Sequence, residues 1–404
     1  MPTQRTARLV LVSGSGAYVG SLPPVAVTTP WWQDIAPVVH AAREQHGVDV
    51  VVLRLLGGEL RQPPGGEVTY LAQVESPVNA KALSHEPWGE LDDQPLRHSY
   101  ARPGGPHADV AWAQSVLERH GMRMTAPAEQ IRTWNLSSVW RLPVGEAYAW
   151  LKVVPPFMVR EGQLLTSLSD APVPTVLGHD GGRCLLAEVA GTDLWSATPD
   201  QLIDMVSLLV RLQSNWVGRL DRLFALGLPD WRGAALTRAI AETLRRTSHE
   251  LANEDVQVLS EFASDLPRRF EALDACGIPD TLVHGDFHPG NFRGHDTALT
   301  LLDWGDSGVG HPLLDQSAFL ERVPPGFMDE VRHHWSQCWR AAFPGADPAT
   351  ASRLLAPIAA ARRAAIYRRF LDHIEPAEHP YHRTDPADWL HQTAELLRDA
   401  TTDR

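Results

Sequence analysis

The stretch from Thr281 to Asp306 constrains this chain more than any other, because it sets polar groups between two short apolar runs. It reads T-L-V-H-G-D-F-H-P-G-N-F-R-G-H-D-T-A-L-T-L-L-D-W-G-D. Apolar runs separated by a Pro-Gly turn predict a strand, a loop and a second strand. The loop then presents Asp286 and Asn291, and Asp303 stands where the second run ends. Carboxylate and amide oxygens are the hard ligands that Mg²⁺ prefers in proteins.

The spacing H-x-D-x-x-x-x-N, with a later Asp at a strand end, resembles the catalytic loop of protein kinases. In that loop the Asp orients and deprotonates the attacking hydroxyl, and the Asn and the later Asp hold magnesium. The resemblance implies that Asp286 is catalytic, that His284 anchors the loop, and that Asn291 and Asp303 bind the metal. The alternative is a hairpin with ordinary turn carboxylates, which the D-W-G-D after the second apolar run disfavours.

The segments H-G-D-F-H-P-G-N, L-L-D-W-G-D and G-H-P-L-L-D are together similar to the aminoglycoside phosphotransferase family, over about residues 125 to 400. This resemblance implies an α+β, two-lobed protein-kinase-like fold, with a β-rich N-lobe at 121–190 and a mainly helical C-lobe at 191–404. It implies ATP and Mg²⁺ as cofactors. It also implies transfer of the γ-phosphate to a hydroxyl of a small molecule, which is aminoglycoside-like, an amino alcohol or a sugar.

Residues 1–120 precede the family motifs and predict a small α+β N-terminal domain. Apolar and alternating runs predict four strands, and helical spacing predicts one helix between the second and third strands. The expected strands are 9–13, 24–29, 48–56 and 67–74, and the expected helix is 32–46. Because the region has no recognisable metal or nucleophile motif, we expect it to cap the ATP-binding lobe or to mediate a homodimer through a sheet edge.

The N-lobe is expected to begin with I-R-T-W-N-L-S-S-V-W, which has the strand, turn, strand form of a nucleotide loop without its glycines. The family commonly has a serine in this turn, so Ser137 and Ser138 are candidate phosphate ligands; the alternative is a plain hairpin turn. Lys152 lies among apolar neighbours in the next strand, where a lysine requires anionic partners. The kinase-like interpretation supplies the nucleotide phosphates and a helix glutamate, which we assign to Glu161.

The run C-L-L-A-E-V-A at 184–190 is expected to lie along the adenine, with hydrogen bonds from the backbone near Glu188 and Val189. The Glu188 side chain is expected to cap an amide of this hinge. After the metal-binding Asp, G-V-G-H-P-L-L-D places Asp315 at a predicted helix start, where we expect it to cap the helix. The family resemblance implies that an acid at this position braces the loop. Helical spacing predicts helices at 108–121, 199–216, 233–252, 259–276, 327–342 and 348–374.

The C-terminal region offers weak candidates for binding the acceptor, each with a solvated helix face as the alternative. They are Asp372, Glu375, Glu378, Tyr367, Tyr381 and Trp389. His373, His379 and His382 lie nearby, but prolines interrupt any regular zinc-ligand spacing. The three cysteines, Cys184, Cys276 and Cys338, are isolated in sequence and make no metal-ligand spacing, so they are expected to be buried thiols.

Composition limits the partners of the chain. Its 404 residues are 44% hydrophobic, which is typical of a globular protein, and no apolar run approaches the length of a membrane helix. We therefore expect a cytoplasmic protein without a membrane partner. A net charge of -13 disfavours nucleic acid and is compatible with a cationic acceptor or simply with solubility. The alternative function is a non-catalytic nucleotide-binding regulatory protein with a kinase-like fold.

Overall fold

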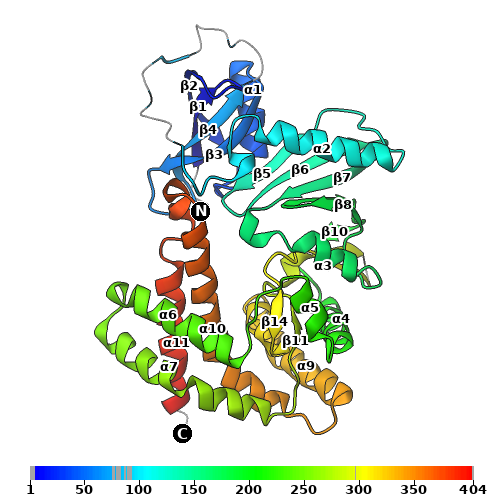
Figure 1. The fold of residues 1–404 in the computed structure, drawn as a ribbon, viewed down its shortest axis with the longest axis vertical. Helices are drawn as coiled ribbons and strands as arrows, with labels where there is room; N and C mark the ends of the chain where they lie inside the picture. Colours follow the sequence, from blue (N-terminus) through cyan, green and yellow to red (C-terminus); the bar gives the residue numbers. More distant parts are fainter. Residues whose placement is uncertain are drawn as a thin grey trace. The chain divides into compact units, whose positions relative to one another are not determined.

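The computed structural model describes residues 5–74, 78, 83–85, 88, 93–295 and 297–402. The chain forms two compact units, each built from segments that are distant in sequence. Strands dominate the first unit and helices the second (Figure 1), which is the α+β composition that the sequence predicts. Unit 1 consists of Met1–Gly162, Val176–Glu188 and Phe370–Arg383, and unit 2 consists of Gln163–Thr175, Val189–Arg369 and Thr384–Arg404.

The first part of unit 1, residues 5–74, is a four-stranded sheet with one helix, which we call the N-terminal module. The strand order is β2-β1-β4-β3; β1 and β4 are parallel and the other pairs are antiparallel. The strand β2 starts earlier than predicted, because an edge strand tolerates Pro23 and Pro24, which cannot donate to a ladder. The elements are β1 (Arg5–Val12), β2 (Tyr18–Val27), α1 (Ala36–His46), β3 (Val50–Gly58) and β4 (Gly66–Val74).

The core of the N-terminal module includes a residue from the far end of the chain. Trp32, Val52 and Tyr70 are buried with residues of α1, and Tyr381 joins the same apolar cluster. Trp32 also donates from Nε1 to Gly65 O at 2.8 Å, so the indole has a polar partner inside the core. A residue more than 300 positions downstream therefore completes the module.

The second sheet of unit 1 has the order β5-β6-β7-β9-β8, with all neighbours antiparallel. The helix α2 (Gly105–Arg119) packs on it through Val116 and Leu117, which share an apolar cluster with Leu142 and Leu151. This helix begins earlier than the predicted 108. The strands are β5 (Glu129–Trp134), β6 (Ser137–Val144), β7 (Ala147–Val153), β8 (Val176–Asp180) and β9 (Arg183–Ala187), and α3 (Glu161–Ser167) follows β7.

Unit 2 is mainly helical, and local signals explain several of its helix ends. Thr198 and Gln201 form a reciprocal capping box at the start of α4. The helix α7 begins six residues before the predicted 259, with acidic residues in its first turn. The helices are α4 (Pro199–Trp216), α5 (Leu220–Ala225), α6 (Gly233–Thr247), α7 (Asn253–Asp274), α8 (Gln316–Leu320), α9 (Met328–Ala342), α10 (Pro348–His373) and α11 (Asp385–Thr402).

Short strands of unit 2 frame the loop that the sequence analysis singled out. The strands β11 and β14 pair with each other, and β12 lies between β10 and β13 in a second small sheet. The predicted strand before residues 284–291 is present as β11, and the predicted strand after them is present as β13. The bounds are β10 (Thr192–Asp193), β11 (Thr281–Val283), β12 (Phe292–His295), β13 (Ala298–Leu301) and β14 (Gly308–Gly310).

The end of α10 belongs to the other unit. The helix lies in unit 2 up to Arg369 and in unit 1 from Phe370. The 3-10 helix η8 (Pro376–Tyr381) follows in unit 1, and the chain returns to unit 2 at Thr384.

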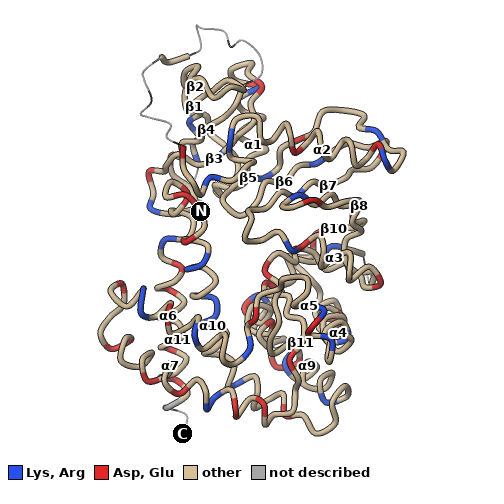
Figure 2. Tube along the Cα trace, viewed as in Figure 1, with Lys and Arg blue, Asp and Glu red and all other residues tan. Residues whose placement is uncertain are grey.

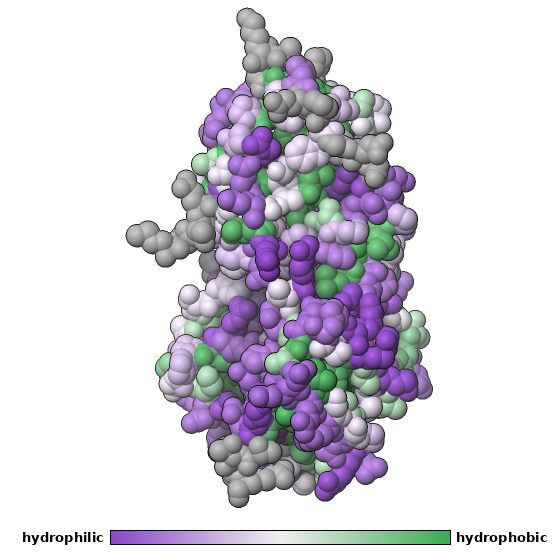
Figure 3. Space-filling model, turned by 90° about the vertical axis from the view of Figure 1, so that its left-hand side faces the viewer, coloured by the Kyte–Doolittle hydropathy of each residue, from purple (hydrophilic) through white to green (hydrophobic). Residues whose placement is uncertain are grey.

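Charged residues of both signs are distributed along the described parts of the chain (Figure 2). Figure 2 shows basic and acidic residues interspersed along both units, and the face drawn in Figure 3 is mainly hydrophilic with small separate apolar areas. Among the residues that the structure describes, no helix is both long enough and apolar enough to cross a membrane.

Candidate active site

His284 fixes the start of the loop in the interior of unit 2. The imidazole is fully buried; its Nε2 donates to Leu302 O at 2.9 Å and its Nδ1 accepts from Asp286 N at 3.3 Å. The ring packs edge-on against Trp304, with centroids 4.6 Å apart. His284 thereby ties the loop to the segment that follows β13.

Asp286 is the accessible carboxylate of the loop, with its side chain 46% exposed. Its Oδ2 accepts from Asn291 Nδ2 at 3.1 Å and lies 3.4 Å from His288 Nε2. Burial raises the pKa of Asp286, but the hydrogen bond and charge of His288, with smaller contributions from His284 and Asn291, outweigh it and lower the pKa to about 2. The carboxylate is therefore ionised at neutral pH and able to accept a proton.

Asp303 stands on a strained backbone. Its φ is 58°, and it is the one non-glycine residue with positive φ in the part of the chain that the structure describes. The next residue, Trp304, is 1% exposed and donates from Nε1 to Leu301 O, while Asp303 itself is exposed. A left-handed backbone at a non-glycine residue is uncommon and clusters at functional sites.

The donor set of this region fits magnesium. Asn291 uses Nδ2 to donate to Asp286 O at 2.8 Å, which leaves its Oδ1 as the acceptor that can serve as a metal ligand. In the described ranges, no group of three or more His, Cys, Asp or Glu side chains is arranged to hold a metal ion. One amide oxygen and one exposed carboxylate suit Mg²⁺, which keeps several waters and takes further oxygens from a phosphate substrate.

The Asp315 carboxylate braces the loop through hydrogen bonds to its backbone. It is 1% exposed; its Oδ2 accepts from His284 N and its Oδ1 from Gly285 N, both at 2.8 Å. Gln213 donates to Oδ2 at 2.9 Å. Burial raises the pKa of this carboxyl, although His284 and the two backbone N–H groups favour its ionised form. The predicted capping role is wrong: Asp315 precedes α8 but makes no side-chain capping bond, because the loop amides take both of its oxygens.

Arg362, in α10, is a contact of the loop that the sequence analysis missed. It is 1% exposed, lies over the Trp231 ring, and donates to Gly285 O at 3.4 Å. Burial lowers the pKa of Arg362, and Asp315, Asp306 and Asp286 raise it. The run A-R-R-A-A-I-Y-R-R has no feature that distinguishes this arginine from its neighbours, so only the fold could identify it.

In unit 1, Lys152 and Glu161 form a pair. Lys152 Nζ lies 2.8 Å from Glu161 Oε2, with side chains 17% and 4% exposed. Cys184 is opposite Lys152 in the β7–β9 ladder. Burial, reinforced by Glu161 and opposed by Lys152, raises the pKa of Cys184 to about 12, so this thiol is not a nucleophile at neutral pH.

The two residues of the predicted hinge belong to different units. Glu188 ends a segment of unit 1 and accepts from Trp150 Nε1 at 2.8 Å. Val189 begins a segment of unit 2, and its carbonyl accepts from Arg293 Nε at 2.8 Å. The assignment of Glu188 and Val189 to the adenine-binding hinge stays a prediction.

Ser137 and Ser138 open β6, next to a tight turn formed by Asn135 and Leu136. The hydroxyl of Ser137 accepts from Trp134 Nε1 at 3.1 Å, and that of Ser138 from Trp140 Nε1 at 2.9 Å. Ser137 is 7% exposed and Ser138 is fully buried. Their assignment as phosphate ligands stays a prediction.

Three of the acceptor candidates, Glu375, Glu378 and Tyr381, are buried in unit 1. Glu375 is 3% and Glu378 is 4% exposed, so the alternative of a solvated helix face is wrong for both. Arg97 pairs with Glu375 at 2.8 Å, and Glu378 Oε1 accepts from Leu55 N at 2.8 Å. The sequence could not reveal this because the partners lie about 300 positions upstream.

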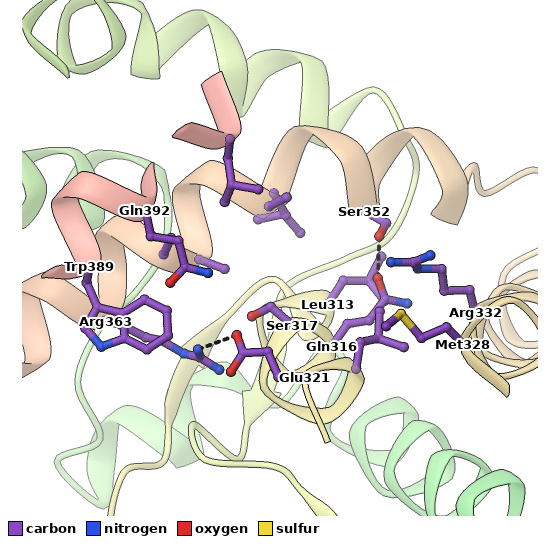
Figure 4. Close-up of a pocket in the computed structure, with 16 residues that line it drawn as sticks. Leu313, Gln316, Ser317, Glu321, Met328, Arg332, Ser352, Arg363, Trp389 and Gln392 are labelled. Carbon is purple, nitrogen blue, oxygen red and sulfur yellow. Dashed lines mark hydrogen bonds and ion pairs between the residues drawn. The ribbon is translucent and has the colours of Figure 1, made fainter. Parts of the chain in front are cut away.

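Another candidate, Trp389, lines a cavity of about 270 Å³ in unit 2 (Figure 4). Arg363 lies over the Trp389 ring at 4.3 Å and pairs with Glu321 at 2.7 Å. Across the cavity Ser352 donates to Gln316 Oε1. Two polar pairs of the lining, Arg363 with Glu321 and Ser352 with Gln316, are thus formed within the cavity wall, and Trp389 serves as a packing partner of Arg363.

A comparison of sequence families identifies the class of protein to which this chain belongs. The model of the phosphotransferase enzyme family (APH) matches residues 141–348, just over half of the chain. The chain therefore belongs to the APH phosphotransferase family. No curated protein is similar enough in sequence to count as a relative.

Solved structures are similar to this chain at low sequence identity, and the first of those described next carries the assignment of the fold. A choline kinase from Streptococcus pneumoniae is 14% identical, with a TM-score of 0.53 over 72% of this chain and 99% of the other. A macrolide 2'-phosphotransferase from Brachybacterium faecium is 18% identical, with a TM-score of 0.48 over 70% and 97%. A spectinomycin phosphotransferase, solved with ADP and spectinomycin, is 11% identical, with a TM-score of 0.44 over 71% and 97%. The predicted kinase-like fold is confirmed.

Proposed function

We propose that this protein is a Mg-ATP-dependent O-phosphotransferase that transfers the γ-phosphate of ATP to a hydroxyl of a small molecule. The observation that carries the proposal is the loop around Asp286: an exposed, ionised carboxylate held by Asn291 and His288. Membership of the phosphotransferase enzyme family supports the reaction class. The acceptor is proposed to be aminoglycoside-like, an amino alcohol or a sugar.

Each site residue has a role in this proposal. Asp286 orients the acceptor hydroxyl and takes its proton. Asn291 Oδ1 and the Asp303 carboxylate hold magnesium, which neutralises the charge of the triphosphate when bound. Lys152, kept in place by Glu161, binds nucleotide phosphates. Alignment and charge neutralisation then supply most of the rate acceleration.

An acceptor screen with ATP consumption as the readout tests the proposal. Amino alcohols, sugars, aminoglycosides and macrolides are incubated with Mg-ATP and the full chain, and phosphorylated product is identified by mass. We expect one of these classes to give product in a magnesium-dependent reaction. Wild-type protein that binds no Mg-ATP would refute the proposal.

The second candidate is a non-catalytic nucleotide-binding regulatory protein. The observation that favours it is the β5–β6 turn, which has no glycine and is almost entirely buried. Mg-ATP binding without turnover, on every acceptor of the screen, would select this candidate over the enzyme.

A further inference from the structure

The turn between β5 and β6 is held by residues from the opposite end of the chain. Asn135, the first residue of the turn, is 2% exposed. Its Nδ2 donates to Glu378 O at 3.3 Å, and its Oδ1 accepts from His382 Nε2 at 3.1 Å. Both polar atoms of this side chain are thus bound by one segment, residues 375–382, which we call the clamp. Turn and clamp belong to unit 1.

Aromatic packing reinforces these hydrogen bonds. The Trp134 ring meets Tyr381 edge-on at 5.7 Å and lies 5.5 Å from the ring of His382. Tyr381 in turn meets Trp32 at 5.8 Å in the core of the N-terminal module. The residue before the turn therefore contacts the clamp, and the clamp contacts the module.

The clamp itself is fixed by buried polar contacts. Arg97 donates to Glu375 Oε2 from Nε at 3.1 Å and from Nη2 at 2.8 Å, and Arg54 Nε lies 3.7 Å from Oε1. Glu378 Oε1 accepts from the backbone N–H of Leu55, in β3. Arg54 and Glu375 are about as buried as core residues. Such contacts are costly to break from one side, because they would leave an unpaired buried charge.

We propose that the clamp holds the β5–β6 turn in one conformation, so that the turn is pre-organised for the nucleotide, and that Asn135 and His382 are positioning residues. This inference rests on the proposed function. A glycine-rich loop loses conformational freedom when it closes on phosphates, whereas a turn already fixed by side chains loses little on binding. Asn135 and the clamp lie outside residues 141–348, so this arrangement is additional to the family match.

Hydrogen exchange and steady-state kinetics on full-length variants test the proposal. Asn135→Ala and His382→Leu each remove the bond between these two side chains, and His382→Gln keeps a donor. We expect the amides of residues 134–138 to exchange about tenfold faster in His382→Leu, which loses one buried hydrogen bond, and at least as much faster in Asn135→Ala, which loses two. The KM for ATP should rise about fivefold with kcat within about twofold, because the turn acts on the nucleotide. His382→Gln should stay near wild type in both measurements.

Gln130→Leu is the matched control. Gln130 joins the N-terminal module to β5 through Val52 N at 2.9 Å and Val52 O at 2.7 Å, without touching the turn. It should lower the unfolding temperature as much as Asn135→Ala does while leaving turn exchange and the KM for ATP unchanged.

Three results would overturn the proposal that the clamp pre-organises the turn. Unchanged exchange at 134–138 in Asn135→Ala and His382→Leu would show that the clamp does not restrain the turn. Tighter nucleotide binding in these variants would show that the clamp obstructs the turn instead. If Gln130→Leu changed the amide exchange of the turn and the KM for ATP by the same amounts, lower overall stability would explain the effect without the clamp. If the wild type bound no nucleotide, the proposed function would fail, and the exchange data would still decide whether the turn is restrained.

Discussion

At the scale of single residues, two aspartates of unit 2 have contrasting settings. Asp286 is held by hydrogen bonds from Asn291 and the nearby His288, which keep its pKa near 2. Asp303 is exposed on a left-handed backbone. The first setting suits a group that must stay ionised and oriented, and the second suits a ligand that reaches out to a cation. Substitutions should separate these roles.

Asp286→Ala is expected to remove turnover and to leave Mg-ATP binding largely intact, because the proposed action of the carboxylate is on the acceptor. The loss in kcat should be about a hundredfold or more, from general-base and positioning effects. Kinetics on an acceptor found in the screen measure the loss, and calorimetry measures nucleotide affinity. Asp329→Ala, on a fully exposed side chain of α9, is the control. Phosphorylation within a few-fold of wild type would contradict the assignment.

Asp303→Asn is expected to abolish the magnesium dependence of nucleotide binding. A neutral amide is a weaker ligand for Mg²⁺ than a carboxylate, whereas both side chains tolerate the left-handed backbone, so the fold should persist. Titrations of ATP with and without magnesium, supported by circular dichroism, measure the effect. Unchanged affinity and metal stoichiometry would show that Asp303 is not a ligand.

Glu378 should make stability depend on pH. Burial raises its pKa from 4.5 to about 8; the Leu55 N–H and Arg54 oppose the rise and Glu375 adds to it. The folded protein then keeps a proton that the unfolded chain releases between pH 4.5 and 8, so this contribution to stability is complete at the acidic end and is lost as pH rises towards 8.

Glu378→Gln, which imitates the protonated form, should flatten this dependence. The difference in unfolding free energy between pH 5 and 8 should shrink by on the order of a few kcal/mol relative to wild type. Urea unfolding at both pH values measures it, with the exposed Glu330→Gln as control. Parallel curves for wild type and Glu378→Gln would mean that Glu378 does not titrate in this range.

At the scale of elements, the catalytic loop owes its shape to residues outside it. Gly285 has φ 96°, and a Cβ there would lie 2.1 Å from Asp306 O, so only glycine fits this approach. Asp315, from the segment before α8, binds two successive loop amides, and Gln213 of α4 holds the same carboxylate. The strands on either side of the loop place it, and this brace fixes its backbone.

Asp315→Asn should therefore loosen the loop. An amide retains one acceptor oxygen and turns an N–H₂ group toward a backbone N–H, which leaves a buried donor unpaired at a cost of about 1–3 kcal/mol. We expect a lower unfolding temperature, faster amide exchange at residues 284–286 and a fall in kcat larger than any change in the KM for ATP. Gln213→Leu, which keeps the carboxylate and removes one donor, should have a smaller effect. Wild-type exchange in Asp315→Asn would argue against the brace.

At the scale of the whole molecule, the N-terminal module shares unit 1 with the second sheet. Gln130 links β5 to Val52 of β3, and α2 covers Leu142 and Leu151 of the sheet. These contacts favour a module that caps the second sheet over an independently tethered domain. Both the cap and the homodimer stay predictions. The domain boundaries at residues 120 and 190 also stay predictions.

A chain starting at Thr125 should be less stable, because it lacks α2 and the N-terminal module. Their loss exposes apolar side chains, and the burial of each such side chain is worth about 1.5–3 kcal/mol. We expect lower solubility and a loss of on the order of 5 kcal/mol or more in unfolding free energy. Sedimentation of the full-length chain tests the homodimer separately. A truncated chain as soluble, heat-resistant and active as the full chain would show that residues 1–120 are an independent domain.

The sequence alone determined the local elements and the identity of the loop. Periodicity and turn residues predicted the strands β3, β4 and β7 and the helices α4, α9 and α10 closely, because the cause of each lies within a few residues. The H-x-D-x-x-x-x-N spacing selected the loop for the same reason. Only the tertiary structure decided which side chains meet across the chain. Asp315 braces the loop, as the family resemblance implies, but the structure shows that it makes no capping bond. The contact of Arg362 with Gly285 and the burial of Glu375 and Glu378 depend on residues far away in the chain, and no local pattern records those.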